Sequence, residues 1–175
     1  MKTTGIVRRI DDLGRIVIPK EIRRTMRIRE GTPLEIYTDG GAVTFKKYSP
    51  VGELSDFTAE YAEAVYKSGG VPVAICDTDS VVAVAGVSKK EYVDKPISEK
   101  LAALMSSRKS YAAADGDDTA LTDGGTGVSY FSPIISEGNV IGGIMSLKVG
   151  DRAADNTEKK LVDAGAYFIS SQSEI

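Results

Sequence analysis

The chain has 175 residues, of which 42% are hydrophobic and 27% charged, a balance typical of one or two ordinary globular domains. It contains no histidine and a single cysteine, Cys76, which excludes an internal disulfide and most zinc sites and removes the usual catalytic bases. The net charge of −3 hides an asymmetry, because residues 1–50 hold eleven Lys and Arg against six Asp and Glu, whereas the remainder holds eleven against nineteen. We therefore expect no catalytic residue, no metal site, and a head, residues 1–50, that binds a polyanion such as DNA.

The sequence also bears on where the protein acts. No run of eighteen apolar residues is present, and the first residues, MKTTGIVRR, lack the apolar core of a secretion signal. A lone cysteine fits a reducing compartment. We expect a cytoplasmic protein that has no membrane partner.

Two strands and a helix are predicted at the start of the head. Residues 6–10 and 13–18 are typical of strands, and the link 11–14 supplies Asp to accept local N–H groups and Gly where a positive φ is needed. Pro19 then suits the start of a short helix, 19–26, because its missing N–H would have no partner there.

Two further strands complete the head. Residues 34–37 and 43–46 alternate apolar and polar side chains, which predicts half-buried strands, and 39–41 carry the Asp-Gly-Gly signal of a hairpin turn. The order β-β-α-β-β in under fifty residues is close to the size at which one chain cannot bury a sufficient core. We predict an interleaved dimer in which each chain supplies strands to a shared core.

The segment TGIVRRIDDLGRIVIPKEIRRTMRIREGTPLEIY, together with the FKKY that closes the head, closely resembles the AbrB-type swapped-hairpin DNA-binding domain of bacterial transition-state regulators. The resemblance covers residues 3 to about 48 and implies a β-barrel dimer that binds double-stranded DNA through shape and flexibility, tolerating varied sequences. It also implies that four arginines contact DNA: Arg8, Arg15, Arg23 and Arg24. We expect the acidic pair Asp11 and Asp12 between the first two to shape the turn.

Two alternatives stay open for the head. The arginines could form a solvated surface that pairs with nearby acidic residues, as runs of charge usually do. The same head fold also serves small antitoxins, whose disordered tails wrap a toxin. The long remainder of this chain, which has the pattern of a folded domain, argues against an antitoxin.

A second domain, the body, is predicted over residues 54–175, joined to the head by the Pro- and Gly-containing stretch 48–52. It begins with a helix, 54–68, and ends with a helix, 157–172, opened by a capping box at Asp155. Between them the pattern predicts strands 71–76 and 81–85, a capping box at Ser88, helix 97–105, a mobile Gly-rich loop 111–127, and strands 128–135 and 139–148. The predicted inward faces of the two long helices are Leu54, Phe57, Tyr61, Ala64 and Val65, and Leu161, Ala164, Gly165, Phe168 and Ile169.

The order of these elements resembles a GAF domain, an antiparallel sheet with helices from both ends of the domain on one face. The fold class is therefore α+β. An AbrB-type head joined to a GAF body, with PVAICDTD and GVSKKEYVDKPIS in the body, also resembles a family of bacterial sporulation regulators. That resemblance implies a nucleoid-associated regulator of late forespore genes that activates some promoters and represses others.

GAF domains often bind a small molecule between the sheet and its loops. Val82 and Val84 lie two residues apart and should share one face of a strand. The predicted lining is Cys76, Val82, Val84, Tyr92, Tyr130, Ile144 and Met145. Each of these residues also suits an ordinary core position, and the residue pattern of cyclic-nucleotide GAF domains is absent. We expect no cofactor, and an unidentified small-molecule effector stays open.

The body could instead serve assembly. Helices 54–68 and 157–172 carry apolar residues off their main faces, namely Tyr66, Val162 and Ala166, so two bodies could form a four-helix bundle. Combined with head pairing, this arrangement predicts a tetramer. Two other classes of function stay open: an antitoxin-like partner protein and a GAF-fold enzyme, although no nucleophile and base pair is evident in the sequence.

Overall fold

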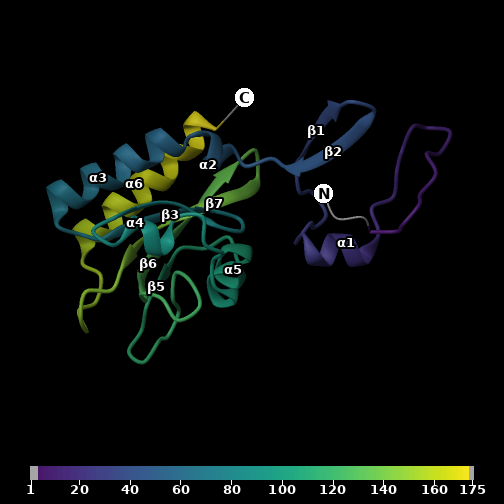
Figure 1. Ribbon diagram of the computed structural model, residues 1–175. Helices are drawn as coiled ribbons and strands as arrows, with labels where there is room; N and C mark the ends of the chain where they lie inside the picture. The colour runs from purple at the N-terminus through teal and green to yellow at the C-terminus, as the bar shows by residue number, and fades with distance from the viewer. Residues whose placement is uncertain (1–3, 174–175) are drawn as a thin grey trace. The chain divides into compact units, whose positions relative to one another are not determined.

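The computed structural model describes residues 4–173. The chain divides into two compact units, a head that ends at Tyr48 and a body that begins at Ser49, and each is described by itself. Both units combine helices with antiparallel strands, which confirms the α+β class (Figure 1).

The head contains helix α1 (Lys20–Thr25) and the hairpin of β1 (Leu34–Asp39) and β2 (Ala42–Lys47). Asp39 pairs with Ala42 around Gly40 and Gly41, whose φ values of 53° and 90° few other residues could adopt. The predicted helix and the predicted hairpin are therefore confirmed.

The two strands predicted over 6–10 and 13–18 are absent from the single chain, which is a correction. These segments have no strand ladder, although a tight turn joins them: the N–H of Asp11 donates to the Arg15 carbonyl at 3.0 Å, and the N–H of Gly14 donates to the Asp11 carbonyl at 3.0 Å. An isolated two-stranded hairpin is marginal in water, so these arms need further strands or a packed face to hold a ladder.

The head has almost no core of its own. Among its described residues, Pro19 is the only buried one, and β1 and β2 are mostly exposed rather than half-buried as predicted. Large apolar side chains that are 41–85% exposed include Ile6, Val7, Ile10, Leu13, Ile16, Val17, Met26, Ile36 and Val43. An apolar surface of this extent marks an interaction site on a soluble protein.

The body is built on a five-stranded antiparallel sheet in the order β4-β3-β7-β6-β5. Its strands are β3 (Val73–Asp77), β4 (Val81–Ala85), β5 (Tyr111–Ala112), β6 (Val128–Ser136) and β7 (Asn139–Leu147). The four long strands were predicted. β5 was not, because it lies inside the segment 111–127 that was expected to be a mobile loop.

That segment is pinned to the body rather than loose. Leu121 is fully buried, the Tyr92 and Thr126 hydroxyls lie 2.8 Å apart, and the Lys148 ammonium donates to the Asp117 carbonyl at 2.6 Å. These long-range contacts could not be predicted from local sequence patterns, because the partners lie up to 34 residues apart.

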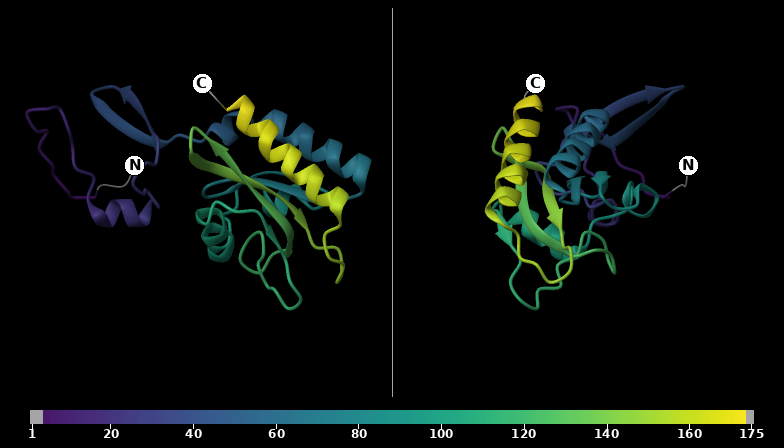
Figure 2. Two further views of the ribbon diagram at one scale, coloured as in Figure 1. Left: turned by 180° about the vertical axis from the view of Figure 1, so that it is seen from behind. Right: turned by 90° about the vertical axis from the view of Figure 1, so that its left-hand side faces the viewer.

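Helices cover both faces of the sheet. The body contains α2 (Pro50–Glu53), α3 (Ser55–Gly69), α4 (Lys89–Tyr92), α5 (Glu99–Ser106) and α6 (Asn156–Gln172). Figures 1 and 2 show α3 and α6 side by side on one face, whereas α5 packs against the other. This arrangement matches the expected GAF architecture, with the two end helices of the domain on a common face.

The helix starts follow the predicted capping in part. The Asp155 carboxylate accepts the N–H of Glu158 at 2.8 Å, which caps α6, but the Glu158 side chain binds Arg152 rather than the Asp155 N–H, so only half of that predicted capping box forms. Ser88 also precedes a helix, α4, but its hydroxyl makes no capping hydrogen bond, so that predicted box is wrong.

The predicted joint, 48–52, is not an open linker. Its second half is α2, capped by Ser49, whose hydroxyl accepts the N–H of Gly52 at 2.9 Å and donates to the Asp77 carboxylate at 2.9 Å. Val51 is fully buried in the body. The first residues after the head are therefore already part of the folded body.

The inward faces of the long helices are rotated from those predicted. In α6 the buried residues are Glu158, Val162, Gly165, Ala166 and Ile169, and in α3 they are Thr58, Ala62 and Val65. A Cβ on Gly165 would lie 2.5 Å from the Tyr61 ring and 2.7 Å from Ile144. The absence of a side chain there lets α6 lie directly on β7 beside α3.

This rotation corrects one expectation about assembly. Val162 and Ala166, predicted to project off the main face, are 1% and 6% exposed in the body's own core. They are unavailable to a second body. Tyr167 and Phe168, 81% and 42% exposed, are the outward apolar residues of α6 instead.

Candidate nucleic-acid interface

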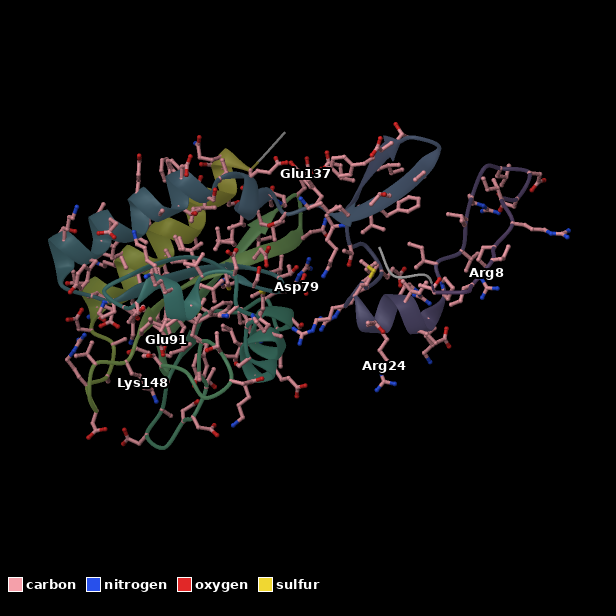
Figure 3. All side chains as sticks on the ribbon, viewed as in Figure 1. Arg8, Arg24, Asp79, Glu91, Glu137 and Lys148 are labelled. Atoms are coloured by element: carbon pink, nitrogen blue, oxygen red, sulfur yellow. The ribbon has the colours of Figure 1, made fainter. Side chains whose placement is uncertain are left out.

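The four candidate arginines are exposed residues of the head, in two places. Arg8 and Arg15 flank the 11–14 turn, and Arg23 and Arg24 lie in the last turn of α1. Figure 3 shows Arg8 and Arg24 extending away from the ribbon of the head. Among the residues that the structure describes, Arg15 is the one of the four that forms an ion pair.

The turn that carries Arg15 is organised by Asp11. One carboxylate oxygen, Oδ1, accepts the N–H groups of Leu13 at 3.0 Å and Arg15 at 2.7 Å, while Oδ2 accepts Nε–H of Arg15 at 2.8 Å. The backbone N–H and then the guanidinium of Arg15 hold the pKa of Asp11 below its usual value, against a small opposing effect of desolvation. Gly14 closes the turn with a φ of 76°, which glycine adopts without strain.

The end of α1 is closed by a Schellman pattern. Ile28 N–H donates to the Arg23 carbonyl at 2.8 Å and Arg27 N–H to the Arg24 carbonyl at 3.2 Å. Arg27 adopts a φ of 53°, a position normally taken by glycine. The sequence could not reveal this, because no glycine stands there. The backbone around Arg23 and Arg24 is thus fixed while their side chains stay exposed.

The predicted ligand-lining residues of the body do not form one group. Cys76, Val84, Tyr92 and Met145 belong to the cluster on the α5 side of the sheet, whereas Val82, Tyr130 and Ile144 pack on the α3–α6 side. Val82 and Val84 therefore fail to share a face, because the ladder between β3 and β4 shifts register beside Cys76. A site that uses all seven residues is not present in this arrangement.

Cys76 is enclosed in the core. It is fully buried, and its thiol donates a weak hydrogen bond to the Gly143 carbonyl, with 3.6 Å between sulfur and oxygen. Burial raises the pKa of the thiol, and the neighbouring Asp77 charge raises it further. Such a thiol stays protonated at neutral pH and is a poor nucleophile.

No group of three acidic or cysteine residues within 4–173 lies close enough to hold a metal ion. No helix in that range is long and apolar enough to cross a bilayer.

An exposed, arginine-bearing head on a GAF-type body defines a two-part architecture, and comparison with known proteins agrees for both parts. Residues 53–174 match the family described as stage V sporulation protein T C-terminal, transcription factor. Residues 7–52 match the family described as antidote-toxin recognition MazE, bacterial antitoxin. The chain belongs to the stage V sporulation protein T family.

Individual relatives follow the same division. Stage V sporulation protein T of Bacillus subtilis is 49% identical over 99% of both chains. The transition state regulatory protein AbrB of the same organism is 53% identical over 62 residues, which are 32% of this chain and 65% of AbrB. The GAF domain of an Acinetobacter phosphoenolpyruvate-protein phosphotransferase has a TM-score of 0.56 at 12% identity, covering 69% of this chain and 81% of that domain, and so agrees in fold alone.

Proposed function

We propose that this protein is a DNA-binding transcriptional regulator of sporulation that acts through its head. The observation that carries the proposal is the 49% identity to a sporulation protein across both units, with an AbrB-like head at one end. In finer detail, the protein regulates late forespore genes, activating some promoters and repressing others. It lies in the cytoplasm with the nucleoid, because DNA is its partner.

Four arginines of the head carry the contact with DNA: Arg8, Arg15, Arg23 and Arg24. A guanidinium group presents several N–H donors in one plane and binds phosphate oxygens in pairs. The longest helix of the described head has six residues, too short to serve as a recognition helix across the major groove. Binding therefore relies on phosphate contacts and DNA shape and tolerates varied sequence.

The head binds DNA as a dimer. Its exposed apolar side chains, such as Val7 and Val17 at 85% and 71% exposure, are left uncovered by the described part of a single chain. A second head supplies that cover and the strands that the 6–10 and 13–18 arms lack, which completes a two-chain β-barrel. Dimerisation also brings eight arginines onto one two-fold surface.

The body joins two such dimers into a tetramer through α3 and α6. The rings of Phe57 and Phe168 lie 5.0 Å apart, one from each helix, and Tyr167, the residue before Phe168, is 81% exposed. These aromatic groups form an apolar strip suited to a helical bundle with a second body. Native mass spectrometry tests this assembly. The unaltered protein should have the mass of a tetramer, and the Phe168→Lys variant should have the mass of a dimer.

A small-molecule effector of the body is a further part of the proposal. The α5 side of the sheet holds four of the seven predicted residues, Cys76, Val84, Tyr92 and Met145, and these are the residues that we expect to contact it. The same mass measurement, made under native conditions, would reveal a retained molecule as added mass on each chain.

The DNA-binding proposal is tested by a gel shift of the full chain on a promoter fragment. Arg8, Arg15, Arg23 and Arg24 are changed singly to Ala, and each variant should bind more weakly. Lys90→Ala removes one positive charge from an exposed site on the body and is the matched control. Unchanged binding in all four head variants would contradict the proposal.

A toxin-neutralising role is the second candidate, because the head also matches an antitoxin family over residues 7–52. The match of residues 53–174 to a transcription factor family favours DNA regulation. Copurification of a stoichiometric toxin chain would favour the antitoxin. A GAF-fold enzyme is the third candidate. Catalytic turnover that persists after the four arginines are replaced would support it.

A further inference from the structure

The two oxygens of the Asp11 carboxylate have separate tasks in the head. Oδ1 accepts two backbone N–H groups, those of Leu13 and Arg15, and so closes the turn. Oδ2 accepts no backbone N–H from residues 4–173 and instead accepts Nε–H of the Arg15 side chain at 2.8 Å. A residue needed for turn shape alone would require only the first oxygen.

The bond to Nε orients the guanidinium group of Arg15. A guanidinium group is planar, so fixing Nε–H on one edge turns the two Nη groups in a defined direction. The Arg15 side chain is 70% exposed despite this bond, so its remaining donors are accessible. The local geometry therefore keeps the Arg15 guanidinium group in one orientation and leaves it accessible.

We propose that Asp11 is a positioning residue for DNA binding, which sets the Arg15 guanidinium for a phosphate of the DNA backbone. This inference rests on the proposed function, since it assigns Asp11 a task within the same surface. The gain is entropic: an arginine already held in one orientation loses less freedom when it binds a phosphate.

General electrostatics argues in the opposite direction, which makes the inference testable. A carboxylate beside a polyanion repels it, so removing the charge of Asp11 should strengthen DNA binding if charge alone mattered. Asp12 is the matched comparison. It is the adjacent acidic residue, is exposed, and forms no hydrogen bond or ion pair within residues 4–173.

The experiment compares Asp11→Asn with Asp12→Asn in the full chain. Asparagine keeps an oxygen for the two backbone N–H groups but presents an amide NH₂, which cannot accept Nε–H, to Arg15. Both variants lose one negative charge per chain. We expect Asp11→Asn to weaken binding to a DNA fragment about tenfold, since each dimer loses two oriented arginines, and Asp12→Asn to bind as tightly as the unaltered protein or more tightly.

A double-mutant cycle shows whether Asp11 acts through Arg15. In an Arg15→Ala background, Asp11→Asn should cause no further loss, because the group that it positions is gone. Arg15→Lys is the second variant. It keeps the charge and the backbone N–H but lacks Nε–H, so it should lose affinity, and full retention of affinity in Arg15→Lys would overturn the positioning role even if Asp11→Asn fails to dimerise.

The outcomes separate this inference from the proposed function. Asp11→Asn binding as tightly as Asp12→Asn, or Arg15→Lys binding as tightly as the unaltered chain, would overturn the positioning role. If Arg15→Ala still binds more weakly in that case, Arg15 contacts DNA without help from Asp11, and the proposed function stands. Unaltered binding by Arg15→Ala would instead remove Arg15 from the DNA surface, and with it the basis of the inference.

Discussion

The body contains a buried ion pair whose removal should be costly. Glu158 is 1% exposed, and its Oε2 accepts a hydrogen bond from the Arg152 guanidinium at 2.8 Å. Its other oxygen, Oε1, is buried without a partner among the described residues. Arg152 is thus the cation that offsets the cost of holding this carboxylate inside the protein.

The change Arg152→Met keeps most of the side-chain volume and leaves the Glu158 charge uncompensated. Breaking a buried pair from one side costs about 3–5 kcal/mol, and the 48% exposure of the Arg152 side chain favours the lower end of that range. For a domain of this size, a loss of about 3 kcal/mol lowers the midpoint of thermal unfolding by about 10 °C. The assay is thermal unfolding of the full chain followed by circular dichroism.

Lys100→Met provides the matched control. It removes one cation from the pair of Lys100 with Asp118, whose side chains are 58% and 77% exposed. Exposed pairs contribute about 0–1 kcal/mol, so the midpoint should fall by at most about 3 °C. Equal effects of the two changes would refute the reasoning, because burial would then make no difference to the pair.

Three further predictions concern backbone and turn geometry. Gly142→Ala should destabilise the body by about 1–3 kcal/mol, because the new Cβ would lie 2.2 Å from the Cys76 carbonyl oxygen, and denaturant unfolding at an unchanged midpoint would refute this. Glu137→Asn should raise stability by about 0.5 kcal/mol, because position 137 has a φ of 48° in the β6–β7 turn; a lower midpoint would count against it. The lowered pKa of Asp11 means that its support of the turn is present above the unfolded-state pKa and fades as pH falls through the folded-state value. Chemical-shift titration of Asp11 by NMR checks this, and a midpoint at or above the usual value would contradict it.

Most of the body could be predicted from its sequence, because local pattern and burial agree there. The strands and long helices fell within a few residues of their predicted bounds, and Asp155 caps α6 as its spacing to Glu158 indicated. The inward face of α6 was misjudged because Gly165 and Ala166 allow close packing. A sequence shows which residues are apolar. It does not show which of two adjacent apolar stripes on a helix will be buried and which will stay exposed to solvent.

The head was harder to predict for a different reason. Its arms at 6–10 and 13–18 have the composition of strands, yet in one chain they have only each other to pair with, and an isolated two-stranded hairpin is marginal in water. Residue type alone did not indicate the positive φ of Arg27. It also did not indicate that the two oxygens of Asp11 bind different groups. Val82 fell on the opposite face from Val84 because a shift in strand register cannot be read from alternation.

The most direct test of the whole account is the salt dependence of DNA affinity for the full chain. If the arginines of a head dimer neutralise about six to ten phosphates, the affinity should fall by about 10³ to 10⁵ between 50 and 200 mM salt, roughly linearly on logarithmic axes. Replacing Arg24 by Ala in every chain should reduce that slope by about two, one for each chain of the dimer. An affinity that is indifferent to salt, or a slope unchanged by loss of this arginine, would contradict the claim that the basic head holds DNA.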